Sequence, residues 1–175
     1  MIESNVNAWN FRRYQAVLDI EVWVPRNRAA AHTASYVRKE AEKRGRLDYG
    51  DVVNAFVTRY REDQGISRAL IKFARRLAQE SGYVVQERKI GATRLILVTG
   101  AGEAWAMWCA RRHVVKIGGR GLENVPKSVI DAYAERYPSR LKSGVLEGPL
   151  PPGPDEEAPK EEPFDSKNPR PDWKD

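Results

Sequence analysis

The hydrophobic pattern changes its period along the chain. Residues 16–24 alternate between two faces with a period of two, which predicts a strand that Pro25 ends. The alanine-rich, charged run at 28–44 predicts a helix that Gly45 stops. A second helix is expected from residue 51 to residue 60, because its apolar residues share one helical face.

The most informative pattern is a helix over residues 67–81. Ser67 is a suitable N-cap and Gly82 a suitable stop, and the apolar residues gather on one side. The opposite side forms a basic stripe with no acid on it, so its cations are expected to be exposed. Arginine and lysine can reach guanine edges in a major groove, and glutamine can reach adenine. We therefore expect this helix to contact DNA through Arg68, Lys72, Arg75, Arg76 and Gln79.

A short β-hairpin is predicted directly after that helix, over residues 84–98. Two apolar runs flank a polar stretch in which Gly91 can supply the positive φ of a turn. The stretch carries Arg88, Lys89 and Arg94. A basic hairpin after a basic helix is the arrangement of a DNA-binding wing, whose tip contacts the sugar-phosphate backbone or the minor groove.

Residues 50–108 resemble the MarR-type winged-helix regulators. The resemblance rests on Gly65-x-Ser67, Leu77, Gly82, Val84, the charged hairpin, Leu97-x-Thr99 and the run Gly100-Ala101-Gly102-Glu103-Ala104. It implies a recognition helix, a wing and a further helix that begins at the Ala-Gly run. The upstream residues do not give the dimerisation arm of that family.

Residues 104–137 resemble the C-terminal DNA-binding domain of the actinobacterial H-NS-like silencers. The resemblance rests on Trp108, Ala110-Arg111-Arg112, Gly119-Arg120-Gly121, Pro126 and Val129-Ile130-Asp131-Ala132-Tyr133. It implies that Arg120 contacts phosphate or an AT-rich minor groove. Leu122 stands where that family has its second loop arginine. The alternative is a helix-loop-helix that packs on the winged helix. Pro126 would begin its last helix, with Val129, Ile130 and Tyr133 buried.

Charge divides the chain into two parts. Residues 1–143 carry a net charge of +11 and residues 144–175 carry −5. The basic part suggests a polyanionic partner, with duplex DNA as the first choice. The acidic part has eight prolines between Pro149 and Pro171, so we expect a disordered tail that could bind a protein partner.

The predicted fold class is therefore α+β and mainly helical, a winged helix-turn-helix with a C-terminal helical extension and a disordered tail. One basic domain would span residues 1–143. It would comprise an N-terminal strand and helix at 14–45, the winged-helix core at 50–113 and the extension at 114–143. The tail would be 144–175.

No catalytic or metal-binding pattern is present in the sequence. His32 and His113 lie away from any plausible nucleophile, and Cys109 is the single cysteine. There is no P-loop, signal peptide or apolar run long enough to span a bilayer. The sequence thus predicts a non-enzymatic, cofactor-free, cytoplasmic and nucleoid-associated DNA-binding protein, a transcriptional regulator or nucleoid protein. The alternative is a protein-interaction or assembly component that uses the same scaffold.

Overall fold

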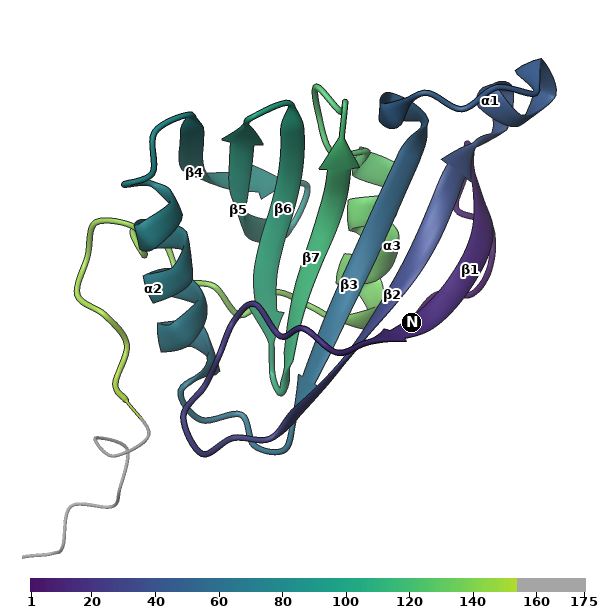
Figure 1. The fold of residues 1–175 in the computed structure, drawn as a ribbon. Helices are drawn as coiled ribbons and strands as arrows, with labels where there is room; N and C mark the ends of the chain where they lie inside the picture. The colour runs from purple at the N-terminus through teal and green to yellow at the C-terminus, as the bar shows by residue number, and fades with distance from the viewer. Residues whose placement is uncertain (154–175) are drawn as a thin grey trace, which may run out of the picture.

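The protein is built around one seven-stranded antiparallel sheet (Figure 1). This computed structural model describes residues 1–153, and residues 154–175 lie outside the described part. The strand order is β1-β2-β3-β7-β6-β5-β4. The strands are β1 (Trp9–Val17), β2 (Ala29–Arg38), β3 (Val52–Tyr60), β4 (Tyr83–Ile90), β5 (Thr93–Gly100), β6 (Glu103–Ala110) and β7 (His113–Arg120).

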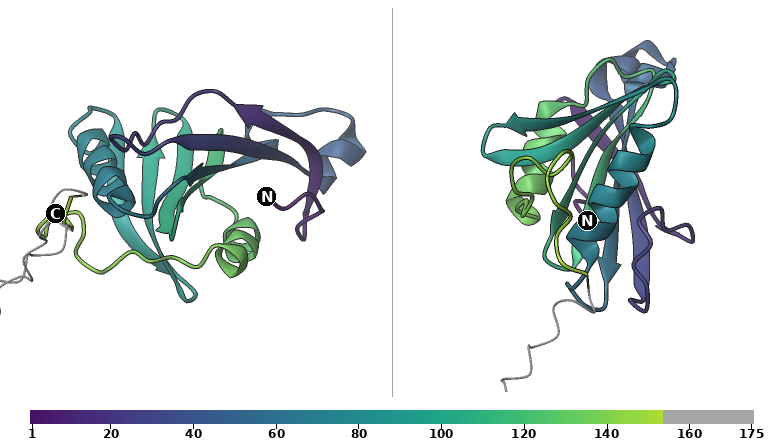
Figure 2. Two further views of the ribbon diagram at one scale, coloured as in Figure 1. Left: turned by 90° about the horizontal axis from the view of Figure 1, so that it is seen from below. Right: turned by 90° about the vertical axis from the view of Figure 1, so that its left-hand side faces the viewer.

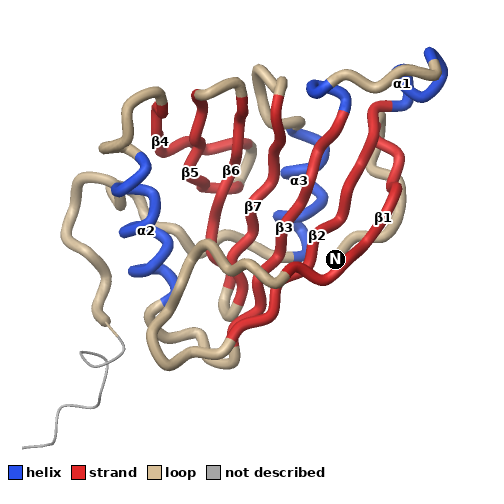
Figure 3. Tube along the Cα trace, in the orientation of Figure 1, coloured by secondary structure: helices blue, strands red, loops and turns tan. Residues whose placement is uncertain are grey.

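Three α-helices and one short 3-10 helix accompany the sheet in the described residues (Figure 3). They are α1 (Lys39–Arg44), η1 (Tyr49–Asp51), α2 (Ile66–Leu77) and α3 (Lys127–Arg136). Helices α2 and α3 lie on opposite faces of the sheet (Figure 2). The two faces follow from strand alternation, as on β3, where Val53 and Ala55 are buried and Asn54 between them is half-buried.

The face under α3 is the main core of the protein. Trp108 of β6 is fully buried there, and its indole Nε1 donates to the Tyr137 carbonyl oxygen at 2.8 Å. Tyr36 of β2 and Tyr133 of α3 share a buried hydrogen bond between their hydroxyl oxygens at 2.8 Å. Burial raises the pKa of both phenols, so both stay protonated hydrogen-bond donors at neutral pH. These contacts fix α3 on the sheet.

The expected mainly helical fold is wrong, and so are the winged helix and the helix-turn-helix. The alanine-rich run expected as a helix is mostly strand β2, paired on both sides by β1 and β3. The expected helix at 51–60 is strand β3. Tertiary pairing overrides the weak helical preference of these segments, and valine and phenylalanine favour strands.

The helices predicted directly after the hairpin are also wrong, because strands β6 and β7 stand in their place. The run at 100–104, which was expected to start a helix, forms the end of β5, a two-residue turn and the start of β6. The turn residues Ala101 (φ 49°) and Gly102 (φ 74°) are both left-handed. Strand β7 occupies the first part of the expected helical extension. The hairpin at 84–98 does exist as β4 and β5, but it belongs to the large sheet.

Two predicted helices are present. The helix expected at 67–81 is α2, and the helix expected after Pro126 is α3, with Val129, Ile130 and Tyr133 buried as predicted. The described chain continues past the expected domain boundary at residue 143. Residues 144–153, called here the C-terminal strap, run along α2, and Val145 is 7% exposed. The rest of the expected tail lies outside the described residues.

Candidate binding site on the open face of the sheet

The basic stripe of α2 holds the chain itself instead of standing free. The guanidinium of Arg68 donates to the Pro151 carbonyl oxygen at 2.7 Å. Arg75 donates to the Val145 carbonyl oxygen at 2.8 Å and also to that of Gly148. Both arginines are half-buried, so the expectation that the stripe is fully exposed is wrong for them. Their donors satisfy strap carbonyl groups that would otherwise need water.

Replacing Arg75 with alanine should therefore destabilise the protein. Hydrogen bonds from a charged donor contribute about 1.5–3 kcal/mol each, and we expect the free energy of unfolding to fall by about 2–3 kcal/mol. Urea unfolding followed by circular dichroism measures this. Lys72→Ala is the matched control, because Lys72 is exposed on the same helix. Equal stability of the two variants would show that the strap contributes nothing through Arg75.

The remaining predicted contact residues, apart from Arg120, lie on the α2 segment and on the β4–β5 hairpin. Lys72 and Arg76 line a groove with Trp23, and Arg76 lies over the Phe73 ring at 5.6 Å. Gln79 is exposed near the end of α2. Arg88 donates to the Gln86 side-chain oxygen at 2.6 Å, and Lys89 is exposed beside it. Arg94 donates to the Ser143 hydroxyl at 3.2 Å. Lys72, Arg76 and Gln79 therefore belong to α2 or its C-terminal end, whereas Arg88, Lys89 and Arg94 belong to the β4–β5 hairpin.

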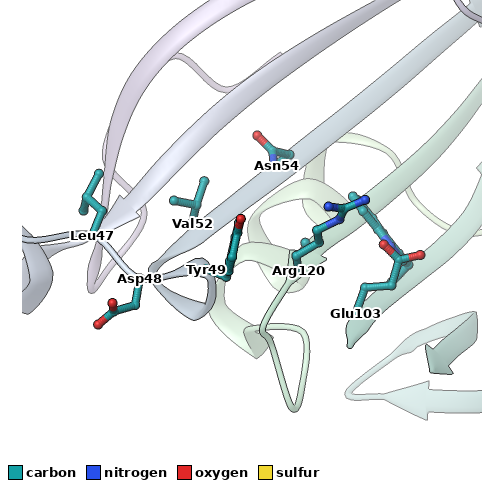
Figure 4. A pocket seen from close by; sticks show the side chains of 9 residues that line it. Leu47, Asp48, Tyr49, Val52, Asn54, Glu103 and Arg120 are labelled. Atoms are coloured by element: carbon teal, nitrogen blue, oxygen red, sulfur yellow. The ribbon is translucent and has the colours of Figure 1, made fainter. Parts of the chain in front are cut away.

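Arg120 alone of the predicted residues lines the hollow on the open face of the sheet (Figure 4). This sheet-face hollow encloses about 660 Å³. One wall comes from the segment at 47–54, and the other comes from the ends of β6 and β7. Its lining residues are Leu47, Asp48, Tyr49, Val52, Asn54, Glu103, Trp105, Gly119 and Arg120.

Trp105 forms the apolar side of the hollow, and its position depends on Gly118, the residue opposite it on β7. It is paired with Gly118 of β7, where an added Cβ would lie 2.0 Å from the Ala104 carbonyl oxygen and 2.8 Å from the indole. Glycine therefore lets the indole lie close to the sheet. The ammonium of Lys116 lies 4.1 Å from the Trp105 indole centroid and 2.7 Å from the Glu21 carboxylate. The attraction between this ammonium and the indole helps to hold the ring in place.

The opposite wall is fixed by a buried carboxylate. Asp51, at the end of η1, is 7% exposed and accepts hydrogen bonds from Arg44 at 2.7 Å and from the Asp48 backbone N–H at 3.2 Å. Gly50 lies so close to Gly121 that a Cβ would be 2.6 Å from its carbonyl oxygen. These contacts hold the 3-10 turn against the end of β7. They leave Tyr49 76% exposed beside the hollow.

Polar groups of both signs surround this apolar centre. The Asn54 side-chain oxygen accepts from the Ser35 hydroxyl at 2.7 Å, and within the described chain its amide nitrogen makes no hydrogen bond. The Arg120 guanidinium makes no hydrogen bond or ion pair with another group of residues 1–153. Glu103, opposite Arg120 in the register, accepts from the Tyr83 hydroxyl at 3.2 Å. Its carboxylate raises the pKa of that phenol.

The ionisable side chains that line the hollow are Asp48, Tyr49, Glu103 and Arg120. The hollow is lined by no cysteine, histidine or serine, and no group of three potential metal ligands occurs anywhere in residues 1–153. Cys109 lies elsewhere, and burial raises the pKa of its thiol. Burial also lowers the pKa of His113, with a contribution from Arg112 and Arg59. No helix in the described part is long and apolar enough to cross a membrane.

Comparison with models of protein families, with curated proteins and with solved structures finds no match. The comparisons therefore neither support nor refute the two family resemblances. Binding to duplex DNA stays a prediction, as does nucleoid association. Arg68 and Arg75 of the expected groove-binding helix bind the C-terminal strap, and the expected wing is part of the large sheet.

Sequence reasoning missed the aromatic residues of the hollow. Tyr49 and Trp105 are far apart in the chain, and they line one hollow because β3 pairs with β7 and β7 with β6. The run Gly118-Gly119 was the one local signal, because adjacent glycines in a strand indicate close approach by other groups. Gly119 was instead assigned to the run Gly119-Arg120-Gly121 of the H-NS-like resemblance, which implies no strand there.

Proposed function

We propose that this chain is a non-catalytic binding protein that recognises a segment of a partner protein in the sheet-face hollow. The observation that carries this proposal is the exposed Tyr49 and the half-buried Trp105 beside Arg120, which has no ion pair within residues 1–153. Tryptophan, tyrosine and arginine are the residues most enriched where binding energy concentrates in protein interfaces. An apolar centre with a polar rim is also the usual anatomy of such interfaces.

The rim defines the chemistry of the bound segment. Arg120 supplies a planar cation for a carboxylate, while Asp48 and Glu103 are suited to a basic side chain or a backbone N–H. Asn54 supplies a free amide donor at the floor. The expected ligand is therefore a peptide with an aromatic or large aliphatic anchor and an adjacent acidic residue, which Arg120 would bind. A second contact to Glu103 would come from a basic residue.

A library of random peptides displayed on phage tests this proposal with the full chain. We expect enriched peptides to carry an aromatic or large aliphatic residue next to an acid. Tyr49→Ala and Arg120→Ala should each weaken binding of an enriched peptide at least tenfold, because each removes a central contact. Tyr49 and Arg120 are exposed, so both variants should fold.

Trp23→Ala is the matched control, because Trp23 is 72% exposed and lies outside the hollow. It should leave affinity within about twofold, and isothermal titration calorimetry with a synthetic peptide measures all three variants. No enrichment, or peptides that bind Tyr49→Ala and Arg120→Ala as well as the unmodified chain, would contradict the proposal.

A further inference from the structure

A second surface, at the opposite end of the strands from the sheet-face hollow, concentrates positive charge. We call it the basic end, and it consists of Arg28, Arg59, Arg61, Arg111 and Arg112. Three separate segments bring these residues together. The Tyr60 backbone N–H donates to the Arg112 carbonyl oxygen at 2.8 Å, and the Arg61 N–H donates to that of Arg28 at 2.8 Å. Arg59 pairs with His113 in the register of β3 and β7.

The arginine side chains of the basic end are exposed and little neutralised. Among the described residues, Arg28, Arg59 and Arg111 have no ion pair, and Arg61 reaches the Glu62 carboxylate only at 4.0 Å. Arg112 donates to the Arg61 carbonyl oxygen at 3.3 Å. The acids beside this group, Glu62 and Asp63, are too few to balance five cations.

A hollow of about 570 Å³ lies within this surface. Residues 61–64 line one side of it and residues 111–113 line the other. Its guanidinium groups therefore approach one space from two different loops. Burial is the main cause of the lowered pKa of His113, and Arg112 and Arg59 lower it further, as expected in a positive local field.

Arg111 occupies a turn position that suits glycine better. It lies between β6 and β7 with φ 48°, a left-handed conformation that is strained for a residue with a Cβ. A glycine there would relax the backbone and remove one guanidinium. This gives a substitution that removes charge from the basic end without a cost to folding.

We propose that the basic end binds phosphoryl groups, and that it does so independently of the sheet-face hollow. The planar fork of a guanidinium matches two phosphate oxygens, and several forks around one space suit a ligand with more than one phosphoryl group. The ligand class is thus a polyphosphorylated anion. Two sources share this chemistry, a free phosphorylated small molecule and a nucleic-acid backbone.

The test compares two pairs of substitutions in the full chain. Arg59→Ser with Arg111→Gly removes two charges from the basic end. Arg88→Ser with Lys89→Ser removes the same charge from β4, at the edge of the sheet. The probes are inorganic tripolyphosphate, citrate and a 20-base-pair DNA duplex of random sequence. Calorimetry measures the small anions, and fluorescence anisotropy measures the duplex.

We expect tripolyphosphate to bind the unmodified chain, and Arg59→Ser/Arg111→Gly to weaken it at least tenfold while the melting temperature does not fall. Arg88→Ser/Lys89→Ser should change the affinity for tripolyphosphate less than twofold. A nucleic-acid source would be assigned if Arg59→Ser/Arg111→Gly also abolishes binding of the duplex and if the affinity for the duplex falls steeply with salt concentration. Tripolyphosphate binding without duplex binding would assign a free phosphorylated ligand.

Three results would overturn the proposal. They are absence of binding by both phosphate probes, equal weakening by the two pairs of substitutions, and citrate binding as tightly as tripolyphosphate. The last two would mean that the surface attracts anions only through net charge. None of these results bears on the peptide proposal, because Tyr49 and Arg120 are unchanged in every variant.

Discussion

Replacing Trp108 with alanine is expected to lower the free energy of unfolding by about 3–5 kcal/mol. The side chain is 0% exposed in the core between β6 and α3, so its removal leaves a cavity. The substitution also leaves the Tyr137 carbonyl oxygen without the indole donor at 2.8 Å. Urea unfolding followed by circular dichroism measures the change.

The exposed Trp23 provides the control for that experiment. It is 72% exposed, and Trp23→Ala should change stability by less than about 0.5 kcal/mol. If the two tryptophan variants were equally stable, the packing of α3 on the sheet would be contradicted. The comparison therefore tests the packing of α3 on the sheet against the helical fold expected from sequence.

Gly118→Ala is expected to destabilise the protein by about 3 kcal/mol, the upper part of the usual range for overpacking. The new Cβ would lie 2.0 Å from the Ala104 carbonyl oxygen, and backbone on an adjacent strand cannot move as a flexible side chain can. It would also push against the Trp105 indole at 2.8 Å. We therefore expect loss of peptide binding together with loss of stability, measured by urea unfolding and calorimetry.

Ala30→Ser is the matched control for this substitution. It also adds one heavy atom, but Ala30 is exposed on β2. It should leave both stability and peptide binding unchanged. A Gly118→Ala variant as stable as Ala30→Ser would contradict the close approach of Trp105 to β7.

Local signals in the sequence identified some elements correctly. Gly91 marked the turn between β4 and β5, and Pro126 marked the start of α3. The helix expected at 67–81 exists as α2, but its predicted ends are wrong, because Gly65 is its N-cap, Ser67 lies inside it and it ends at Leu77, before Gly82. Each of these signals acts over a few residues. None depends on which distant segment lies alongside.

The strands that form the centre of the sheet could not be predicted in this way. On β3, Val53 and Val57 are four residues apart, a spacing that fits one helical face as well as alternate positions on a strand. The alanines of β2 favour a helix in isolation. Pairing between β2 and β3 and between β3 and β7 decides the outcome, and such long-range contacts leave little trace in a single sequence.

The same limit applies to the binding residues. Arg120 was predicted as an anion-contacting residue, and the structure places it in the hollow, without testing what it binds. Arg68 and Arg75 were predicted on the basis of an exposed stripe. The C-terminal strap binds both of these arginines, and no pattern in α2 itself could indicate the strap.

The most direct test of the sheet-face hollow is the NMR response of the five tryptophan indole N–H signals to a library-selected peptide. Assignment by single tryptophan-to-phenylalanine variants separates the signals. The account predicts a saturable shift of the Trp105 signal, while the signals of Trp23 and the buried Trp108 stay in place. A peptide that shifts Trp23 and leaves Trp105 unchanged would contradict it.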